Sequence, residues 1–369
     1  MLHFRIATYA YMASALSGSL VIYLFGRPAS RSMLGMLFLA ASFFAIYGLL
    51  AGDTPLSSFP AFCGLGSLAA LALTALWSPR ATERQASLDT CLTAFLFPLF
   101  LAIAGFSLAV TTAAHPMTYD FFLYAFDEQL NCQPSFLAGQ LLDRSHFLQQ
   151  ACILGYESLP LAMALAFALE RRRPARDHPS TLPAAFAVAA AGGFLLYNLY
   201  PAVGPVHVFP TQFPYSPPPA GSPPFRLLAA GPEARNAMPS VHIAMALLIL
   251  WTSRAWPAVL RVFAAALLAV TVLATLGLGE HYLVDLVVAV PFAALAQSLG
   301  AANVPWRNAT RMVCVSFTVL SVLVCLMYLR QALPPLGGRG AWAWSLLLAC
   351  GGASLILESR LHRIGTAAP

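Results

Sequence analysis

The sequence carries very little charge for its length. Only 9% of its 369 residues are Asp, Glu, Lys or Arg, and lysine is missing altogether, so that all 20 basic residues are arginine. Soluble domains contain roughly 25% charged residues, whereas 59% of this chain is hydrophobic and its mean hydropathy is +0.73. The composition excludes a soluble domain and predicts an integral membrane protein.

Metal-binding and redox cysteine patterns are also missing. No two of the seven cysteines are spaced C-x-x-C, and five of them lie within apolar runs. Cys132 and Cys152 could share one side of the membrane, which leaves a disulfide between them open. We therefore expect neither a metal nor a cofactor. The net charge of +6 does not indicate a nucleic-acid partner, because the arginines lie mainly in short turns.

Long apolar segments dominate what is present. Windows of about 20 apolar residues, the length that crosses a bilayer as a helix, occur eleven times. The first is long enough to span, so we expect an anchor and not a cleaved signal peptide. The sequence thus predicts an all-α, polytopic transmembrane helix bundle of about eleven spans, near 6–26, 32–52, 56–77, 89–112, 148–169, 182–203, 239–256, 257–278, 282–301, 312–332 and 342–359.

The arginines predict the orientation of this bundle. In an eleven-span arrangement 14 of the 20 fall on one side, and arginine-rich short loops are typical of the cytoplasmic side. The N-terminus would then lie outside and the C-terminus inside. Short loops and an all-arginine composition favour a bacterial inner membrane. The cytoplasmic set is Arg27, Arg31, Arg80, Arg84, Arg171, Arg172, Arg173, Arg176, Arg254, Arg261, Arg307, Arg311, Arg360 and Arg363.

Two longer loops are expected on the outer side. The first, residues 113–147, mixes acidic and aromatic side chains, which is typical of an amphipathic segment at the membrane interface. The second, residues 204–238, is dense in proline and cannot be helical for most of its length. We expect it to form a stiff, irregular lid.

Two histidines are expected at one face of the membrane. His242 and His281 lie 39 residues apart, and the apolar chain between them suffices for two crossings, which return it to the side that it left. Asp285 follows His281 by four residues, a spacing that shares one face of a helix. A carboxylate there would fix the imidazole tautomer and leave the other ring nitrogen basic. An alternative interpretation stays open, in which the hydrogen bond between His281 and Asp285 only stabilises the end of a helix.

Residues around His242 indicate an anion site. Pro239 suits the first turn of a helix, which places Ser240 and His242 at its outer end. Free N–H groups at a helix start, with a hydroxyl, favour an anion. Arg235 offers a planar fork to phosphate oxygens, and Asn236 follows it. Two histidines, a carboxylate and an arginine beside such a helix start predict phosphoryl-transfer chemistry.

These residues carry a family resemblance. Pro239-Ser240-x-His242 and His281-x-x-x-Asp285 resemble the last two motifs of the type 2 phosphatidic acid phosphatase superfamily. Glu280 directly precedes His281, the nucleophilic position of that motif. We expect its side chain to point to another side of the helix and to serve as a structural or entry-gate charge.

The residues within and around these motifs resemble one branch of the superfamily more closely than the others. Residues 235–242 (RNAMPSVH) and 277–285 (GLGEHYLVD) resemble inositol phosphorylceramide synthases, as do residues 200–205 and 119–127. The phosphatases of the superfamily carry a basic first motif and a Ser-Arg pair before the nucleophilic histidine. Here Ala274-Thr275 replaces that pair. The departure favours the transferase branch over a plain lipid phosphatase.

The resemblance implies an organisation and a mechanism. Residues 113–301 would form a six-helix catalytic core, flanked by transmembrane helices at 1–112 and 302–369. His281 would attack the phosphorus of a lipid substrate and form a phosphohistidine, with Asp285 orienting it and His242 acting as acid and base. Arg235, Ser240 and Asn236 would hold the phosphate, without a metal and on the periplasmic face.

Two other functions stay open at this point. The same His-His-Asp site could hydrolyse a lipid phosphomonoester or diphosphate to inorganic phosphate. His281 and Asp285 could also relay protons in a transporter. A transporter would need polar residues throughout the membrane midplane, and these are scarce in the sequence. Oligomeric state is not indicated.

Overall fold

The computed structural model describes residues 2–52, 55–172, 182–219, 221, 226–330 and 339–367. The described chain is almost entirely helical, with one two-stranded antiparallel ladder in which β1 (Met117–Thr118) pairs with β2 (Leu228–Ala229). It divides into two compact units, each described here by itself. Unit 1 comprises Met1–Gly105 and Glu157–Arg173, and unit 2 comprises Phe106–Tyr156 and Pro174–Pro369.

Unit 1 is a small helical bundle. Close packing of small residues joins its helices: a Cβ added to Gly64 of α3 would lie 1.9 Å from the backbone oxygen of Leu16 in α1. The peptide N–H of Leu161 in α8 also donates to Ser14 of α1. The helices are α1 (Leu2–Phe25), α2 (Ser30–Ala51), η1 (Leu56–Ser58), α3 (Phe59–Trp77), most of α4 (Ala81–Ala114) and α8 (Leu159–Arg171).

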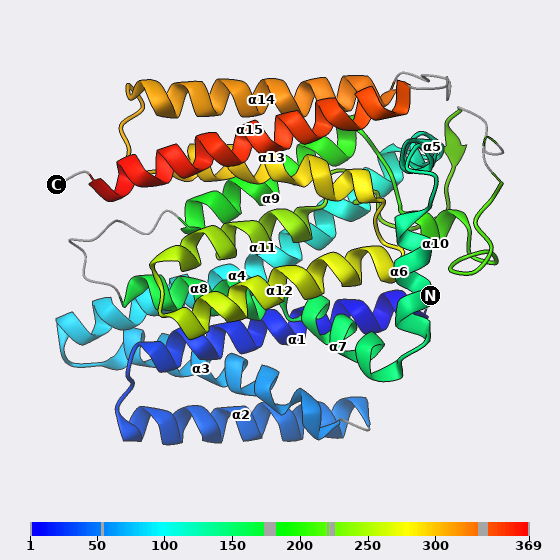
Figure 1. Ribbon diagram of the computed structural model, residues 1–369. Coiled ribbons are helices and arrows are strands. Elements are labelled where there is room, and N and C mark those ends of the chain that lie inside the picture. The colour runs from blue at the N-terminus through cyan, green and yellow to red at the C-terminus, as the bar shows by residue number, and fades with distance from the viewer. Residues whose placement is uncertain are drawn as a thin grey trace. The chain divides into compact units, whose positions relative to one another are not determined.

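Unit 2 contains long helices that run side by side, with short helices gathered at one end (Figure 1). The long ones are α9 (Leu182–Leu199), α11 (Val241–Thr252), α12 (Ala258–Gly277), α13 (Leu283–Gly300), α14 (Ala309–Arg330) and α15 (Arg339–Ala367), with η2 (Ser253–Ala255) ending α11. The short ones are α5 (Asp120–Glu128), α6 (Pro134–Asp143) and α10 (Pro205–Val208). The remaining helix is α7 (His146–Glu157). The most buried long helix is α13, which packs against α9, α11, α14 and α15.

Each of the eleven predicted spans coincides with helix. Among the described residues, seven helices are long and apolar enough to cross a membrane, and an eighth crossing results if α7 and α8, bent by 55°, form one span. The apolar parts of α1 and of α11 with η2 are shorter, over Ala10–Phe25 and Val241–Ala255. The crossings by α1, α11 and α15 therefore stay predictions, whereas the multi-pass helical fold is confirmed.

The predicted domain limits differ in part from the two units. The limit expected after residue 112 lies close to the division at Gly105, but Glu157–Arg173 groups with unit 1 because α8 packs against α1. The helices α14 and α15 pack on α13 and belong to unit 2.

The first outer loop is more structured than expected. Instead of lying on the surface, α5 has six buried residues, among them Asp120 and Asp127. This part of the expected interfacial segment is therefore internal, whereas many other residues of 113–147 are exposed. Cys132, in the turn after α5, is exposed and free, and Cys152 is buried and free, so the disulfide left open between them is not formed.

The proline-rich loop is irregular where the structure describes it, as predicted, and it is anchored to α5 and α6. The Tyr124 hydroxyl donates to the carbonyl of Pro218 at 2.8 Å, and the Gln140 amide donates to that of Pro214 at 3.0 Å. Aromatic rings add to this attachment, since Phe136 of α6 packs against Phe213 with centroids 5.1 Å apart.

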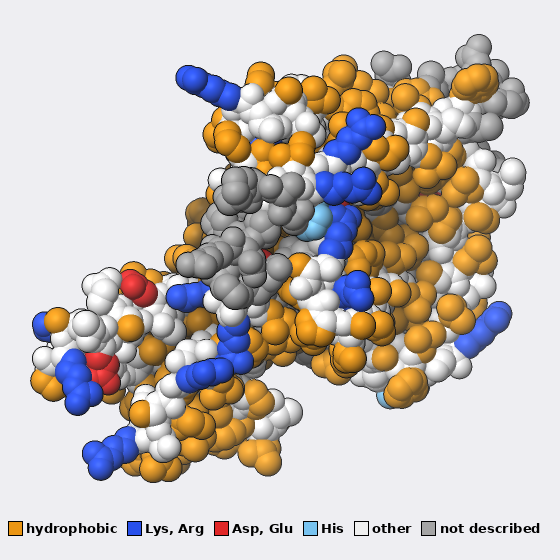
Figure 2. All heavy atoms as spheres, turned by 60° about the vertical axis from the view of Figure 1, so that its left-hand side comes forward, with side chains coloured by type: hydrophobic (Ala, Val, Ile, Leu, Met, Phe, Trp, Pro, Cys, Tyr) orange, Lys and Arg blue, Asp and Glu red, His pale blue; other side chains and the backbone are white. Residues whose placement is uncertain are grey.

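The surface suits a lipid environment. Figure 2 shows mostly hydrophobic side chains, with scattered basic groups and few acidic ones. In unit 2, several arginines lie at the helix ends away from α5 and α10. Arg254 forms an ion pair with Glu358 at 2.8 Å, and Arg311 donates to carbonyl groups at the end of α13. Arg173 and Arg176, two of the predicted cytoplasmic arginines, lie outside the described residues.

Candidate active site

The connector between α12 and α13 carries His281. Its backbone is held on both sides, because its N–H donates to the carbonyl of Thr275 at 3.1 Å and its carbonyl accepts from the Ser135 hydroxyl at 2.8 Å. The preceding Gly279 has φ +76°, a conformation that favours glycine. The connector therefore places His281 at a fixed point at the start of α13.

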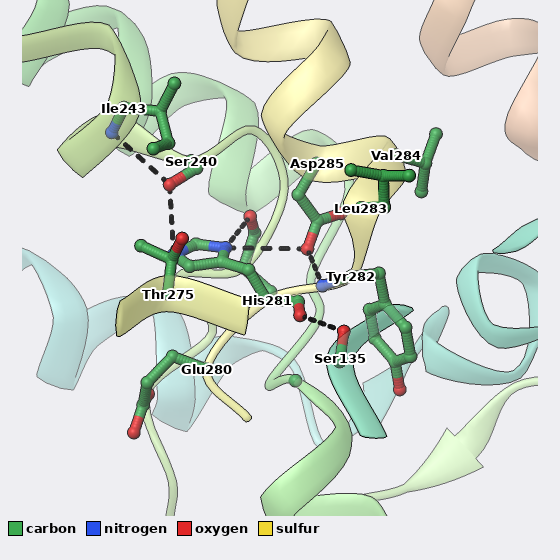
Figure 3. Close-up of polar contacts among 12 residues, drawn as sticks. Ser135, Ser240, Ile243, Thr275, Glu280, His281, Tyr282, Leu283, Val284 and Asp285 are labelled. Carbon is green, nitrogen blue, oxygen red and sulfur yellow. Dashed lines mark hydrogen bonds and ion pairs between the residues drawn. The ribbon is translucent and has the colours of Figure 1, made fainter. Parts of the chain in front are cut away.

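The contacts of the imidazole of His281 define its tautomer (Figure 3). Nδ1 lies 2.8 Å from the carbonyl oxygen of Ala237 and 3.4 Å from Oδ2 of Asp285. A carbonyl oxygen can only accept, so Nδ1 carries the proton. Nε2 then presents its lone pair, and the Ser240 hydroxyl lies 3.2 Å from it. His281 is only 1% exposed, which protects this nitrogen from bulk water.

The predicted contact between His281 and Asp285 is present, but the expected reason for it is wrong. The two side chains were expected on one face of a helix, whereas α13 begins only at Leu283 and His281 precedes it in extended backbone. The contact forms because Asp285, in the first turn, turns back and accepts the N–H of Tyr282 at 2.8 Å. The carboxylate thereby caps its own helix and faces His281.

Ser240 joins the second histidine to this centre. It is the N-cap of α11, which begins at Val241, so Pro239 precedes the helix and does not occupy its first turn as predicted. The N–H of Ser240 donates to the carbonyl of Asp285 at 3.3 Å, which ties the start of α11 to the start of α13. His242 is in the first turn of α11, and the predicted return of the chain to one end of the bundle is confirmed.

His242 has an aromatic neighbour that the sequence did not indicate. The ring of Tyr156, from α7, stacks on its imidazole with centroids 4.1 Å apart and planes inclined by 14°. No local spacing connects the two residues, because they come from separate helices.

Arg235 makes contacts of a different kind from those expected. Its guanidinium is 1% exposed and donates to three backbone carbonyls, those of His115 (2.9 Å), Glu233 (2.5 Å) and Ala230 (3.3 Å). Burial lowers the pKa of this group. These bonds brace the segment before α11. Asn236, beside it, is half-buried, and a phosphate contact by either residue stays a prediction.

Two carboxylates of α5 hold the backbone around the site. Asp120 accepts the N–H groups of Val203 and Gly204 at 3.1 and 2.9 Å. Asp127 accepts those of Leu283 and Val284, the first residues of α13, at 2.6 and 3.1 Å. Neither role was predicted from the sequence, because such pairings depend on tertiary contacts.

Glu280 turns away from Asp285 and Ser240 (Figure 3). Its carboxylate lies 3.6 Å from Nε2 of His207, and both side chains are partly exposed. Burial lowers the pKa of His207, but the Glu280 carboxylate outweighs it, so that the pKa is raised overall. The pair forms a polar contact beside the buried histidine, in agreement with the expected direction of Glu280.

Comparison with known families agrees with this geometry. Residues 121–299 match a family model described as PAP2 superfamily, that is, type 2 phosphatidic acid phosphatase. The match supports the PAP2 superfamily. It covers just under half of the chain and includes Asp127, Tyr156, His242, His281 and Asp285. No curated protein and no solved structure matched the chain. The superfamily has a helical membrane fold and indicates an enzyme of the phosphatase or phosphotransferase type.

Proposed function

We propose that this chain is a membrane lipid phosphotransferase resembling inositol phosphorylceramide synthase, which transfers a phospho-head group through a phosphohistidine at His281. The observation that supports this proposal most is the tautomer of His281. With Nδ1 facing Ala237 and Asp285, Nε2 is the nitrogen whose lone pair can attack phosphorus. A histidine that served only to hold a helix end would not need a buried, proton-free nitrogen beside a helix N-terminus.

The reaction proceeds in two steps. In the first, a bond forms between Nε2 of His281 and phosphorus, the phosphorus–oxygen bond to the donor's alcohol breaks, and His242 gives its proton to the leaving oxygen. The phosphorylated imidazole is cationic, and the Asp285 carboxylate stabilises it. In the second, the acceptor's hydroxyl gives its proton to His242 and its oxygen displaces His281.

The start of α11 would hold the phosphate. The Ser240 hydroxyl accepts the N–H of Ile243 at 3.5 Å and lies 3.2 Å from Nε2 of His281, so it would contact a phosphate bound at this nitrogen. Arg235 retains two N–H donors beyond the three that it gives to carbonyls, so it could add a contact together with Asn236. The histidines and these donors balance the developing charge, and the proposal needs no metal.

Lipid phosphate hydrolysis is the second candidate, because water can replace the acceptor alcohol in the same second step. Purified protein in detergent, without added metal, is given phosphatidylinositol with ceramide, and separately a plain lipid phosphate. The products are identified by mass spectrometry for the wild type, for His281→Ala and for His146→Ala, an exposed histidine at the start of α7 that serves as control.

Transfer predicts a new phosphodiester lipid in the wild type and in His146→Ala, but not in His281→Ala. Inorganic phosphate released only from the plain lipid phosphate would instead assign a phosphatase. Unchanged activity in His281→Ala would contradict both.

A further inference from the structure

The ring stacked on His242 belongs to a residue that the reaction above does not use. Tyr156 is largely buried near the C-terminal end of α7, and its ring is nearly parallel to the imidazole, at 4.1 Å and 14°. Parallel contact over a full ring face restricts rotation of the imidazole about its χ2 torsion. The plane of His242, and with it the direction of its N–H, depends on Tyr156.

The residue before Tyr156 lies at a close approach between α7 and α12. A Cβ added to the preceding residue, Gly155, would lie 2.4 Å from Cγ1 of Val270 in α12. Cys152, one turn earlier, is completely buried. Glycine therefore allows α7 to approach α12 closely at this point, directly beside Tyr156.

We propose that Tyr156 is a positioning residue for His242. The stacked ring aims the imidazole at the leaving oxygen, to which His242 gives its proton in the first step. This inference rests on the proposed function, because it needs His242 as the general acid. Its chemistry is the proton balance given above: the proton leaves His242 as the phosphorus–oxygen bond breaks and returns from the acceptor's hydroxyl.

A comparison of leaving groups tests the inference. An alkyl alcohol must be protonated as it leaves, whereas nitrophenolate leaves without a proton. Tyr156→Leu should slow an alkyl-leaving lipid phosphodiester about 10-fold or more, since a positioned general acid contributes about 10²–10⁴-fold. With both substrates followed through the first step alone, before the acceptor's hydroxyl needs His242 as its base, the same variant should release nitrophenolate within about 3-fold of the wild-type rate. Tyr156→Phe, which keeps the ring, should resemble wild type on both substrates.

A double variant separates positioning from a general structural effect. If Tyr156 acts through His242, adding Tyr156→Leu to His242→Ala should cause no further loss on the alkyl substrate. Equal losses on both substrates, additive losses in the double variant, or no loss in Tyr156→Leu would overturn the inference. His281→Ala run in parallel tests the proposed function separately, because activity retained there on both substrates would contradict the phosphohistidine whatever the result for Tyr156.

Discussion

The single residue on which the chemistry depends most is Asp285. Its carboxylate faces the protonated nitrogen of His281 and accepts the N–H of Tyr282. In Asp285→Asn the side chain loses its negative charge, so it no longer stabilises the cationic phosphorylated imidazole, even where the amide oxygen keeps the two contacts of Oδ2. We expect turnover to fall by about 10²-fold or more, in the range of general acid–base effects.

The measurement for Asp285 is steady-state turnover of the lipid substrate. Asp89→Asn, the same change at an exposed position in α4, is the matched control and should keep wild-type activity. Full turnover in Asp285→Asn would show that the carboxylate serves the helix start alone.

Arg235 could brace the chain before α11 or bind phosphate, and the sequence did not distinguish these two roles. If it braces the chain before α11, Arg235→Lys breaks most of its three bonds to buried carbonyls, and the unfolding free energy should fall by about 2 kcal/mol. KM for the lipid donor should then change little. If Arg235 binds phosphate, KM should rise or kcat fall while stability stays near wild type. Thermal unfolding in detergent, together with kinetics on the same preparation, distinguishes these outcomes.

For single residues, the sequence predicted that His281 and Asp285 lie close together, because positions four apart share one face of a helix. It could not predict which backbone groups either residue would meet, so the helical explanation was wrong. Tyr156 was out of reach for another reason: it meets His242 through the packing of α7 on α12, and no pattern within either segment records that packing.

Among the elements, α5 acts as a brace for the site. Asp127 accepts the first two N–H groups of α13, the helix that carries Asp285. Asp127→Ala would leave both groups buried without an acceptor, and we expect a loss of about 2 kcal/mol in unfolding free energy. Activity should fall as well, because the start of α13 is no longer held.

Hydrogen exchange and thermal unfolding measure this effect. Exchange should accelerate at the amides of Leu283 and Val284 in Asp127→Ala. Asp143→Ala, at the exposed end of α6, removes a carboxylate of the same kind and should leave these amides protected. Unaltered protection in Asp127→Ala would contradict the bracing role.

Hydropathy predicted the long elements well, because a bilayer requires about 20 apolar residues in every helical crossing. It did not predict the break between α7 and α8 within an apolar run, nor the short helices α5 and α6. The short helices depend on contacts with segments far away in the sequence, namely the proline-rich loop, α12 and α13. The break coincides with Pro160 at the start of α8.

For the molecule as a whole, the arginines predict that the active-site end of unit 2 faces the periplasm. Cys132, exposed in the turn between α5 and α6, reports on this end. A membrane-impermeant maleimide should label it in intact spheroplasts, and Cys132→Ser should abolish the signal, since the other six cysteines are buried or half-buried. Labelling only after the membrane is opened would show that this end faces the cytoplasm and would contradict the predicted orientation.

Trapping the intermediate tests the central claim most directly. Protein mixed with a lipid donor labelled at phosphorus is quenched within one turnover and mapped by peptide mass spectrometry. The account predicts acid-labile, base-stable label on His281, which accumulates in the wild type, disappears when the acceptor alcohol is added, and is absent from His281→Ala. Product formation with no label on His281, or label that persists in His281→Ala, would contradict it.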